Sequence, residues 1–219
     1  MATRLVLAEL VDGFQQRTGI RAVIESVGGV DAAKRVQAGE AFDFVVLASD
    51  AIDKLVASGH VRAGSKVDFA RSGIAVAVRA DAPQPDISTE AALREAVRAA
   101  QSVSYSTGPS GVAVAKLFER WGMTQEIQSR LVQAPPGVPV GGLVARGEVA
   151  LGFQQLSELM HLEGIVVLGP LPVAIQVTTT FSAGACTGSL QAGAVQALWA
   201  YLRSADAAAA LLSNGMSPA

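Results

Sequence analysis

Apolar runs rich in valine, isoleucine and phenylalanine alternate along the chain with segments whose apolar residues recur every three or four positions. The first pattern predicts buried β-strands and the second predicts amphipathic helices. Strands are expected at residues 20–27, 42–49, 72–80, 102–105, 131–133 and 149–153, and in "GIVVLG" and "AIQVTTTFSAG". This alternation predicts an α/β fold with a mostly parallel sheet.

Helices are expected between these strands, at residues 5–17, 32–38, 50–59, 89–99, 140–146, 191–202 and 205–212, with a helical turn at 154–160. Asp31 stands where an N-cap is expected before the second helix, and Ser110 before the helix that follows residues 102–105. In α/β folds, ligands bind in the loops between a strand and the next helix. The expected loops of this kind are Gly28–Asp31, Ala48–Asp50 and Ser106–Gly111.

Composition excludes several classes of protein. The net charge of the 219 residues is −2, and the absence of a basic run argues against a nucleic-acid partner. No apolar run approaches the roughly 20 residues of a membrane span. A single cysteine, Cys186, excludes an internal disulfide, and with two histidines a structural zinc site is not expected. Cys186 is expected to be a small buried residue.

The common catalytic motifs are missing from the sequence. Lys116 comes too late after Gly111 for a phosphate-binding P-loop, and no G-x-G-x-x-G follows a strand. "YSTGPSG" does not match the G-x-S-x-G nucleophile elbow, and His60 and His161 have no motif-level partner. We therefore expect no cofactor, while binding of a small anion remains compatible with these absences.

The turn in "SVSYSTGPSGVAVAKLFERWG" has the chemistry of an anion site. The N–H groups and the dipole at a helix N-terminus favour negative charge. Ser106, Thr107 and Ser110 add hydroxyl donors, and Gly108 and Gly111 would let the backbone approach a ligand. The simpler interpretation is an ordinary loop between a strand and a helix.

Three longer segments resemble the periplasmic molybdate-binding proteins: "GGVDAAKRVQAGEAFDFVVLASDAIDKLVASGHV", "STGPSGVAVAKLFERWGM" and "LVARGEVALGFQQLSEL". The resemblance implies a type II periplasmic-binding-protein fold, in which two α/β lobes hold an anion in the cleft between them. The implied lobes are residues 1–73 with 182–219, and residues 74–181. The implied crossovers fall near Ser72–Ala75 and Thr180–Gly184.

The sequence departs from that family in two ways. The family opens with a strand and "AAAS" before its first helix, whereas Met1 stands at the start of the expected helix. The two serines that donate to molybdate would align near Ala2 and with Gly28–Gly29, and neither position has a serine. An organic carboxylate is therefore expected in place of molybdate. Location stays open: periplasmic from the resemblance, or cytoplasmic from the chain as written, which shows no signal peptide.

Arginine is suited to a carboxylate, which it binds in bidentate fashion. Arg4, at the start of the first helix, and Arg71, at a crossover, are the candidates, although either could be an ordinary surface residue. Threonines 178–180 could face the ligand or simply favour a strand, and Gln154 and Gln155 could donate or start a helix. The expected ligand-binding residues are Ala2, Thr3, Arg4, Gly28, Gly29, Arg71, Ser72, Ser106, Thr107, Gly108, Ser110, Gly111, Gln154 and Thr179.

Asp31 is a carboxylate next to an expected anion site, where it would repel the ligand. Two interpretations explain its presence. It either caps a helix or acts as a general base, with Tyr105 as the other candidate proton carrier. The second interpretation follows from a relative within the same fold, a periplasmic aconitate isomerase. The favoured function is a solute-binding protein that passes a small anion to an ABC-transporter permease. The alternative is a cofactor-independent isomerase of a di- or tricarboxylate.

Overall fold

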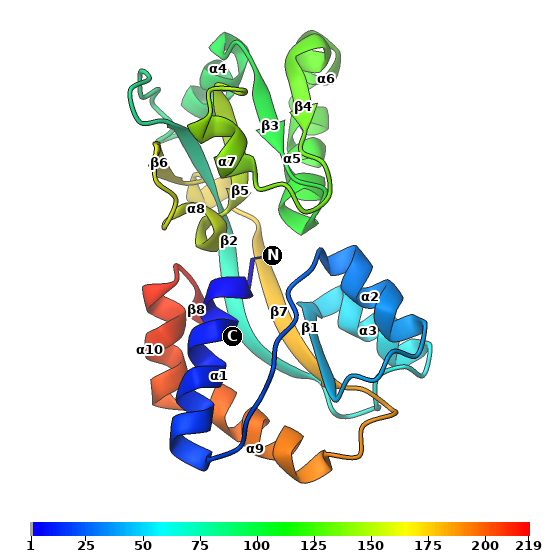
Figure 1. Ribbon diagram of the computed structural model, residues 1–219. Helices are drawn as coiled ribbons and strands as arrows, with labels where there is room; N and C mark the ends of the chain where they lie inside the picture. Colours follow the sequence, from blue (N-terminus) through cyan, green and yellow to red (C-terminus); the bar gives the residue numbers. More distant parts are fainter. Residues whose placement is uncertain (1) are drawn as a thin grey trace. The chain divides into compact units, whose positions relative to one another are not determined.

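The computed structural model describes residues 2–219 (Figure 1). The chain divides into two compact units: unit 1 comprises Met1–Ser72 and Thr179–Ala219, and unit 2 comprises Gly73–Thr178. The chain passes between them twice, inside strand β2 (Val67–Arg79) and at the start of strand β7 (Thr178–Ala185). Within residues 2–219, no helix is long and apolar enough to cross a membrane.

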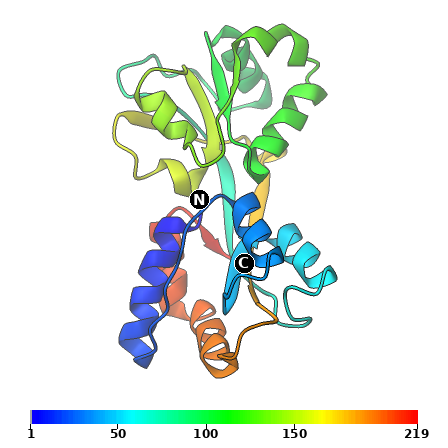
Figure 2. The same cartoon turned by 45° about the vertical axis from the view of Figure 1, so that its right-hand side comes forward.

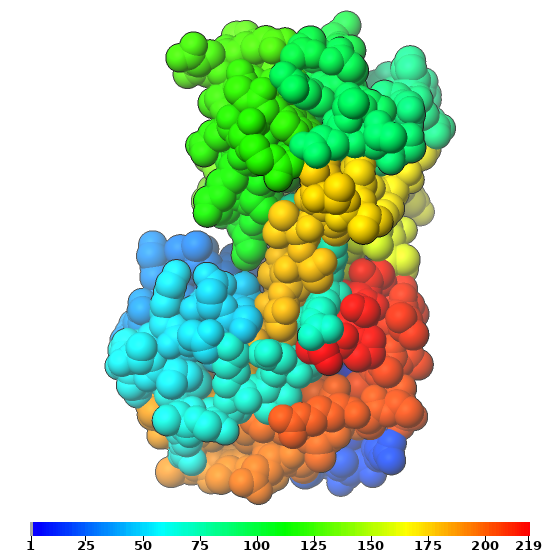
Figure 3. Space-filling view, turned by 180° about the vertical axis from the view of Figure 1, so that it is seen from behind, coloured from blue at the N-terminus to red at the C-terminus, as the bar shows by residue number. Residues whose placement is uncertain are grey.

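Unit 1 begins with three helices and one strand, and it ends with the C-terminal elements after the second passage. The first group is α1 (Arg4–Thr18), α2 (Gly29–Gln37), β1 (Phe44–Ala48) and α3 (Ser49–Ala57). The last group is α9 (Ala192–Leu202), α10 (Ala205–Ser213) and β8 (Ser217–Pro218). The C-terminal elements lie on the surface of this unit, coloured orange to red in Figure 3.

Strand β7 is the middle strand of the sheet in unit 1, between β1 and β2. Strand β1 pairs with it antiparallel, from Phe44 opposite Ala185 to Ala48 opposite Phe181. Side chains alternate along β1: Val45 and Leu47 pack with α3, whereas Phe44 and Val46 pack against the core formed by α1, α9 and α10. The sheet therefore carries a hydrophobic layer on each face.

The strand predicted at residues 20–27 is wrong. This segment links α1 to α2 as an extended chain (Figures 1 and 2) without strand pairing. Its burial alternates as in a strand, since Ile20, Ala22 and Ile24 pack against the core while Arg21 and Val23 are exposed. Among residues 2–219, however, no backbone group pairs with residues 21–27. The β-branched pattern set the conformation, but a strand also requires a hydrogen-bonding neighbour.

Unit 2 is built around a mixed sheet whose β2 pairs with β5 (Leu151–Gln155) and β6 (Ile165–Pro170). Strands β3 (Val103–Tyr105) and β4 (Leu131–Gln133) complete it. Its helices are α4 (Glu90–Ala99), α5 (Pro109–Arg120), α6 (Thr124–Ile127), α7 (Val140–Ala145) and α8 (Leu156–Leu159), with 3-10 turns η1 (Gln128–Arg130) and η2 (Val173–Ile175). Thr89 caps α4 by accepting the Ala92 N–H at 3.1 Å.

The expectation of a mostly parallel sheet is wrong. In the described chain β3 pairs parallel with β4 and β5, whereas β2 pairs antiparallel with β5, β6 and β8. Strand β2 is long and shared by both units, and hydrophobic periodicity does not report the direction of the strands beside it. The strand predicted at residues 72–80 covers only the second half of β2.

Most of the other expected elements are confirmed with boundaries shifted by one to three residues. Cys186 is buried, as expected, and its pKa is raised to about 11 by burial and by the nearby Asp43 carboxylate. The largest core of unit 2 packs Phe118 of α5 edge-on against Phe153 of β5, with ring centroids 5.7 Å apart. This packing fixes α5 against the ends of the parallel strands.

Candidate functional site

Three parallel strands of unit 2 end at the same edge of its sheet, β3 and β4 level with each other and β5 two residues further on. Tyr105, the last residue of β3, is opposite Gln133 of β4 and Phe153 of β5. The segments that leave these strands therefore start from one edge of the sheet: the turn before α5, the link after β4, and the end of β5 before α8. The carboxyl edge of parallel strands is where α/β folds place their ligands. We call this place the carboxyl edge of unit 2.

The turn at residues 106–111 begins α5 earlier than the sequence indicates. Gly108 is the N-cap and Pro109 is the first helical residue, so the prediction of Ser110 as N-cap is wrong. The fixed φ of proline suits the first helical position, which leaves Ser110 inside the first turn. Its hydroxyl lies 3.2 Å from that of Ser106, and the Ser106 hydroxyl also accepts the Gly108 N–H at 3.2 Å.

This turn leaves two backbone donors unused. Among residues 2–219, no group accepts the N–H of Ser110 or of Gly111. Both are first-turn groups of a 12-residue helix, where the partial positive charge of the dipole is located. Ser106 and Ser110 place hydroxyls beside them, and Thr107 is exposed next to Ser106. The arrangement can hold a carboxylate or another small anion.

Gly111 has a structural reason to be glycine. A Cβ at this position would lie 1.6 Å from the Ser106 carbonyl oxygen, whereas one at Gly108 would make ordinary contact with the Ser106 hydroxyl at 3.6 Å. The close approach at Gly111 is thus made by the chain itself. It requires no ligand to explain it.

Gln154 and Glu158 form a hydrogen-bonded pair at the same edge. Gln154 is a buried residue of β5, and its Oε1 accepts the Gly141 N–H at 3.1 Å. This bond orients the amide, whose NH2 group then donates to the half-buried Glu158 carboxyl on α8. Burial raises the pKa of Glu158 above its ordinary value and outweighs the influences that lower it, of which the Gln154 bond is one.

Glu158 was not among the residues expected from the sequence. The available signal was "FQQLSEL", in which an acidic residue follows the end of a strand by three positions. The predicted helical turn at 154–160 masked it, because Gln154 and Gln155 are the last residues of β5 and α8 begins only at Leu156.

Tyr105 has a packing role in unit 2. Its ring meets that of Phe118 edge-on, with centroids 6.5 Å apart, and it packs against the core of this unit. Its carbonyl accepts the Ala134 N–H, which extends the β3–β4 pairing by one residue. The half-buried ring is thereby fixed beside the turn at residues 106–111.

Unit 1 carries the remaining expected residues. Arg4 is exposed in the first turn of α1, Thr3 is its N-cap, and Ala2 packs against the core. Arg71 pairs through its backbone with Ser217 of β8, next to the buried Ser72. Neither the Arg4 nor the Arg71 guanidinium has an ion-pair partner among the residues described, so both are available to an anion. Thr179 begins the part of β7 that belongs to this unit.

The prediction of Asp31 as an N-cap is wrong. Helix α2 begins at Gly29 and Gly28 is its cap, with φ −59° and ψ 142°, while Asp31 lies exposed in the first turn. Its charge at this end of a helix is favourable in itself, because it complements the helix dipole.

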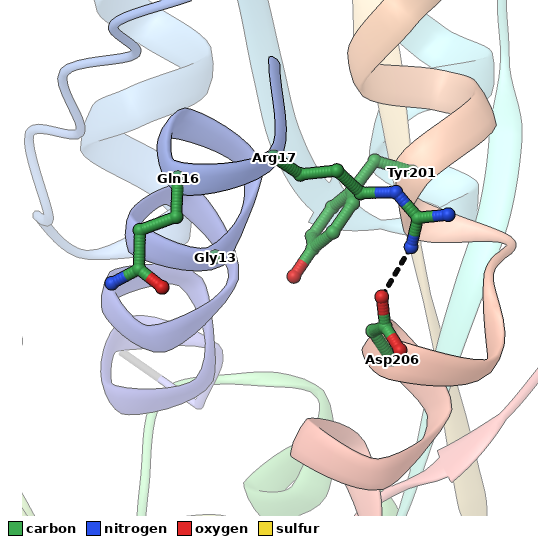
Figure 4. A pocket seen from close by; sticks show the side chains of 5 residues that line it. All are labelled: Gly13, Gln16, Arg17, Tyr201 and Asp206. Carbon is green, nitrogen blue, oxygen red and sulfur yellow. Dashed lines mark hydrogen bonds and ion pairs between the residues drawn. The ribbon is translucent and has the colours of Figure 1, made fainter. Parts of the chain in front are cut away.

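Unit 1 also contains a surface depression of about 510 Å³ lined by Gly13, Gln16, Arg17, Tyr201 and Asp206 (Figure 4). An Arg17–Asp206 ion pair links α1 to α10 there. A Cβ at Gly13 would lie 2.2 Å from the Tyr201 hydroxyl, so the depression marks a close approach of helices. None of the expected ligand-binding residues lines it. Residues 2–219 contain no cluster of metal-ligating side chains.

The carboxyl edge of unit 2 is the kind of place at which α/β proteins hold a small solute on strand-end loops. The model of the family "Bacterial extracellular solute-binding protein" matches residues 1–217, and this chain belongs to that family. The chain is 39% identical over 218 residues to "Aconitate isomerase" from Pseudomonas sp., covering 97% of this chain and 83% of the relative.

Solved structures agree on the fold. The periplasmic molybdate-binding protein of Azotobacter vinelandii has a TM-score of 0.80 at 19% identity, covering 98% of this chain and 94% of that one. The substrate-binding domain of a molybdenum ABC transporter from Clostridium difficile has a TM-score of 0.77 at 12% identity, covering 100% and 95%. The resemblance to molybdate-binding proteins and the type II fold class are thus confirmed.

Proposed function

We propose that this protein binds a tricarboxylate and interconverts its double-bond isomers, as an aconitate isomerase. The observation that carries the proposal is the 39% identity to a relative of that name along nearly the whole chain. The sequence alone favoured a transport-type binding protein and held the isomerase as the alternative. A relative named as an enzyme, matched over 97% of this chain and 83% of its own length, reverses that preference.

The chemistry needs only groups that this chain has. Aconitate is a propene that carries three carboxylates, and its isomers interconvert when a proton leaves the methylene carbon and returns at the other end of the allylic system. The C–H electron pair forms the new double bond while the old one becomes single. The chain must therefore hold carboxylates and supply one acid–base group.

Hydrogen bonds to the substrate carboxylates also help the proton to leave. The carbanion formed spreads its charge into the adjacent carboxylates, and fixed N–H donors stabilise that charge. The free N–H groups of Ser110 and Gly111, with the hydroxyls of Ser106 and Thr107, are the proposed donors in unit 2. The proposed ligands in unit 1 are Arg4 and Arg71, with Ala2, Thr3, Gly28, Gly29, Ser72 and Thr179 around them.

Proton NMR of cis- or trans-aconitate with the purified protein tests the proposal. We expect either isomer to convert to the same equilibrium mixture, with deuterium entering the substrate when the solvent is D2O. The protein without aconitate and aconitate without the protein are the controls. If stoichiometric protein produces no conversion and no deuterium incorporation, the isomerase proposal is refuted.

Transport-type binding is the second candidate, and the family match favours it. It predicts a thermal shift with an anion and no turnover. A ligand at 100 times its dissociation constant adds about 2.7 kcal/mol to the free energy of unfolding. Aconitate, citrate, molybdate and tungstate should be compared, because a shift with molybdate or tungstate alone would favour oxyanion binding over both carboxylate hypotheses.

A further inference from the structure

We propose that the Glu158 carboxylate is the base that takes the proton from the substrate and, once protonated, the acid that returns it. This inference rests on the proposed isomerase function and assigns its chemical step to a residue. It starts from the position of Glu158 on α8, three residues beyond the end of β5. The anion-holding turn before α5 leaves β3, the parallel neighbour of β5, at the same edge.

The surroundings of Glu158 suit a proton carrier. The side chain is half-buried, on a helix that directly follows a fully buried strand. A carboxylate that is poorly hydrated binds a proton more tightly than an exposed one. Burial accordingly raises the pKa of Glu158.

Gln154 holds this carboxyl in place. Its Oε1 is committed to the Gly141 N–H, so its NH2 group is the part that faces Glu158. A donor on one carboxyl oxygen leaves the other oxygen free to accept a proton from carbon. Because Gln154 is buried in the fully buried strand β5, the orientation is set by rigid structure.

The two proton carriers expected from the sequence are less well placed. Asp31 is exposed in the first turn of α2, where its carboxylate is hydrated. The Tyr105 ring packs edge-on against Phe118 in the core of unit 2. Glu158 is the acidic side chain at the carboxyl edge of unit 2 that combines partial burial with a fixed amide donor.

The proposed step balances without a further reactant. Glu158 removes a methylene proton and the C–H pair becomes part of the delocalised carbanion, while the conformation in which the methylene carboxylate is held sets the geometry of the new double bond. The protonated Glu158 then delivers the proton to the far allylic carbon, and the new double bond remains where the proton was lost. The carboxylate is regenerated.

Glu158→Gln tests the inference, with Glu163→Gln as the matched control because Glu163 is exposed five residues further on. We expect Glu158→Gln to keep the thermal shift with aconitate, and to lose both isomerisation and deuterium incorporation by about 10²- to 10⁴-fold. Glu163→Gln should behave as the wild type. Wild-type turnover in Glu158→Gln overturns the inference and leaves the isomerase intact, whereas an inactive wild type refutes the isomerase itself.

A second variant covers the case in which Glu158→Gln does not fold. Glu158→Asp keeps the charge and withdraws the carboxyl by one methylene, so kcat should fall at least tenfold while KM stays within about twofold. An unchanged kcat in folded Glu158→Asp contradicts direct proton transfer by this group.

Discussion

The side-chain amide of Gln176 pairs with the backbone of Ile74 as a neighbouring strand would. Its Oε1 accepts the Ile74 N–H and its Nε2 donates to the Ile74 carbonyl, both at 3.0 Å. The same Oε1 accepts the N–H of Val177. These bonds join the two segments of unit 2 that lead to its boundaries, at Gly73 and at Thr178.

Replacing Gln176 with alanine removes both bonds to Ile74, which is a fully buried residue. We expect the free energy of unfolding to fall by about 1–3 kcal/mol, because a strand group is left without its partner. Urea denaturation followed by circular dichroism measures it. Gln84→Ala, in an exposed loop, is the control and should change stability by less than about 0.5 kcal/mol.

Gly111→Ala should damage the turn before α5. The added Cβ meets the Ser106 carbonyl oxygen at 1.6 Å, so backbone must move and we expect a loss of about 3 kcal/mol or more. Gly108→Ala is the matched change, since its Cβ makes ordinary contact and the loss should stay below about 1 kcal/mol. Equal thermal midpoints for the two variants would contradict the geometry described for the turn.

Protonation of the Glu90 carboxylate should destabilise unit 2 in acid. Hydrogen bonds from Trp121 Nε1 at 2.6 Å and Arg120 at 2.7 Å lower the pKa of Glu90 in the folded state. A lowered folded pKa gives stability that is present above the unfolded value and is lost as pH falls through the folded value. Urea midpoints at pH 6 and pH 3 should therefore differ less in Glu90→Gln than in the wild type.

The control for this pH dependence is Glu119→Gln, on the exposed surface of α5. It should leave the difference between the two midpoints unchanged. A wild-type pH dependence in Glu90→Gln would exclude this carboxylate as its source.

Arg71→Ala should weaken aconitate binding while leaving the fold intact. Its guanidinium is exposed and unpaired in the described chain, so removing it costs little stability. Loss of a charge-assisted carboxylate contact should raise Kd by about tenfold or more by calorimetry. Arg203→Ala, another exposed arginine of unit 1, should bind as the wild type does. Unchanged affinity in Arg71→Ala would remove Arg71 from the site.

The sequence predicted most helices and strands because periodicity reports which faces of an element are buried. It could not predict strand direction, since the pattern of β2 is the same whether its neighbours are parallel or antiparallel. The caps at Gly28 and Gly108 were missed for a related reason. Asp31 and Ser110 are better capping residues by type, but the backbone conformation starts each helix earlier in the chain. Glu158 acquires its environment only from Gln154 and Gly141, which tertiary structure brings to it.

The unpaired link at residues 21–27 gives unit 1 a gradient of local stability. Its amides lack backbone acceptors within residues 2–219 and should exchange with deuterated solvent quickly, whereas those of β7, flanked by β1 and β2, should exchange slowly. The Gly28–Asp31 turn stands at the end of this link. It can therefore shift at small energetic cost while the sheet stays intact, so unit 1 combines a compliant loop with a rigid scaffold.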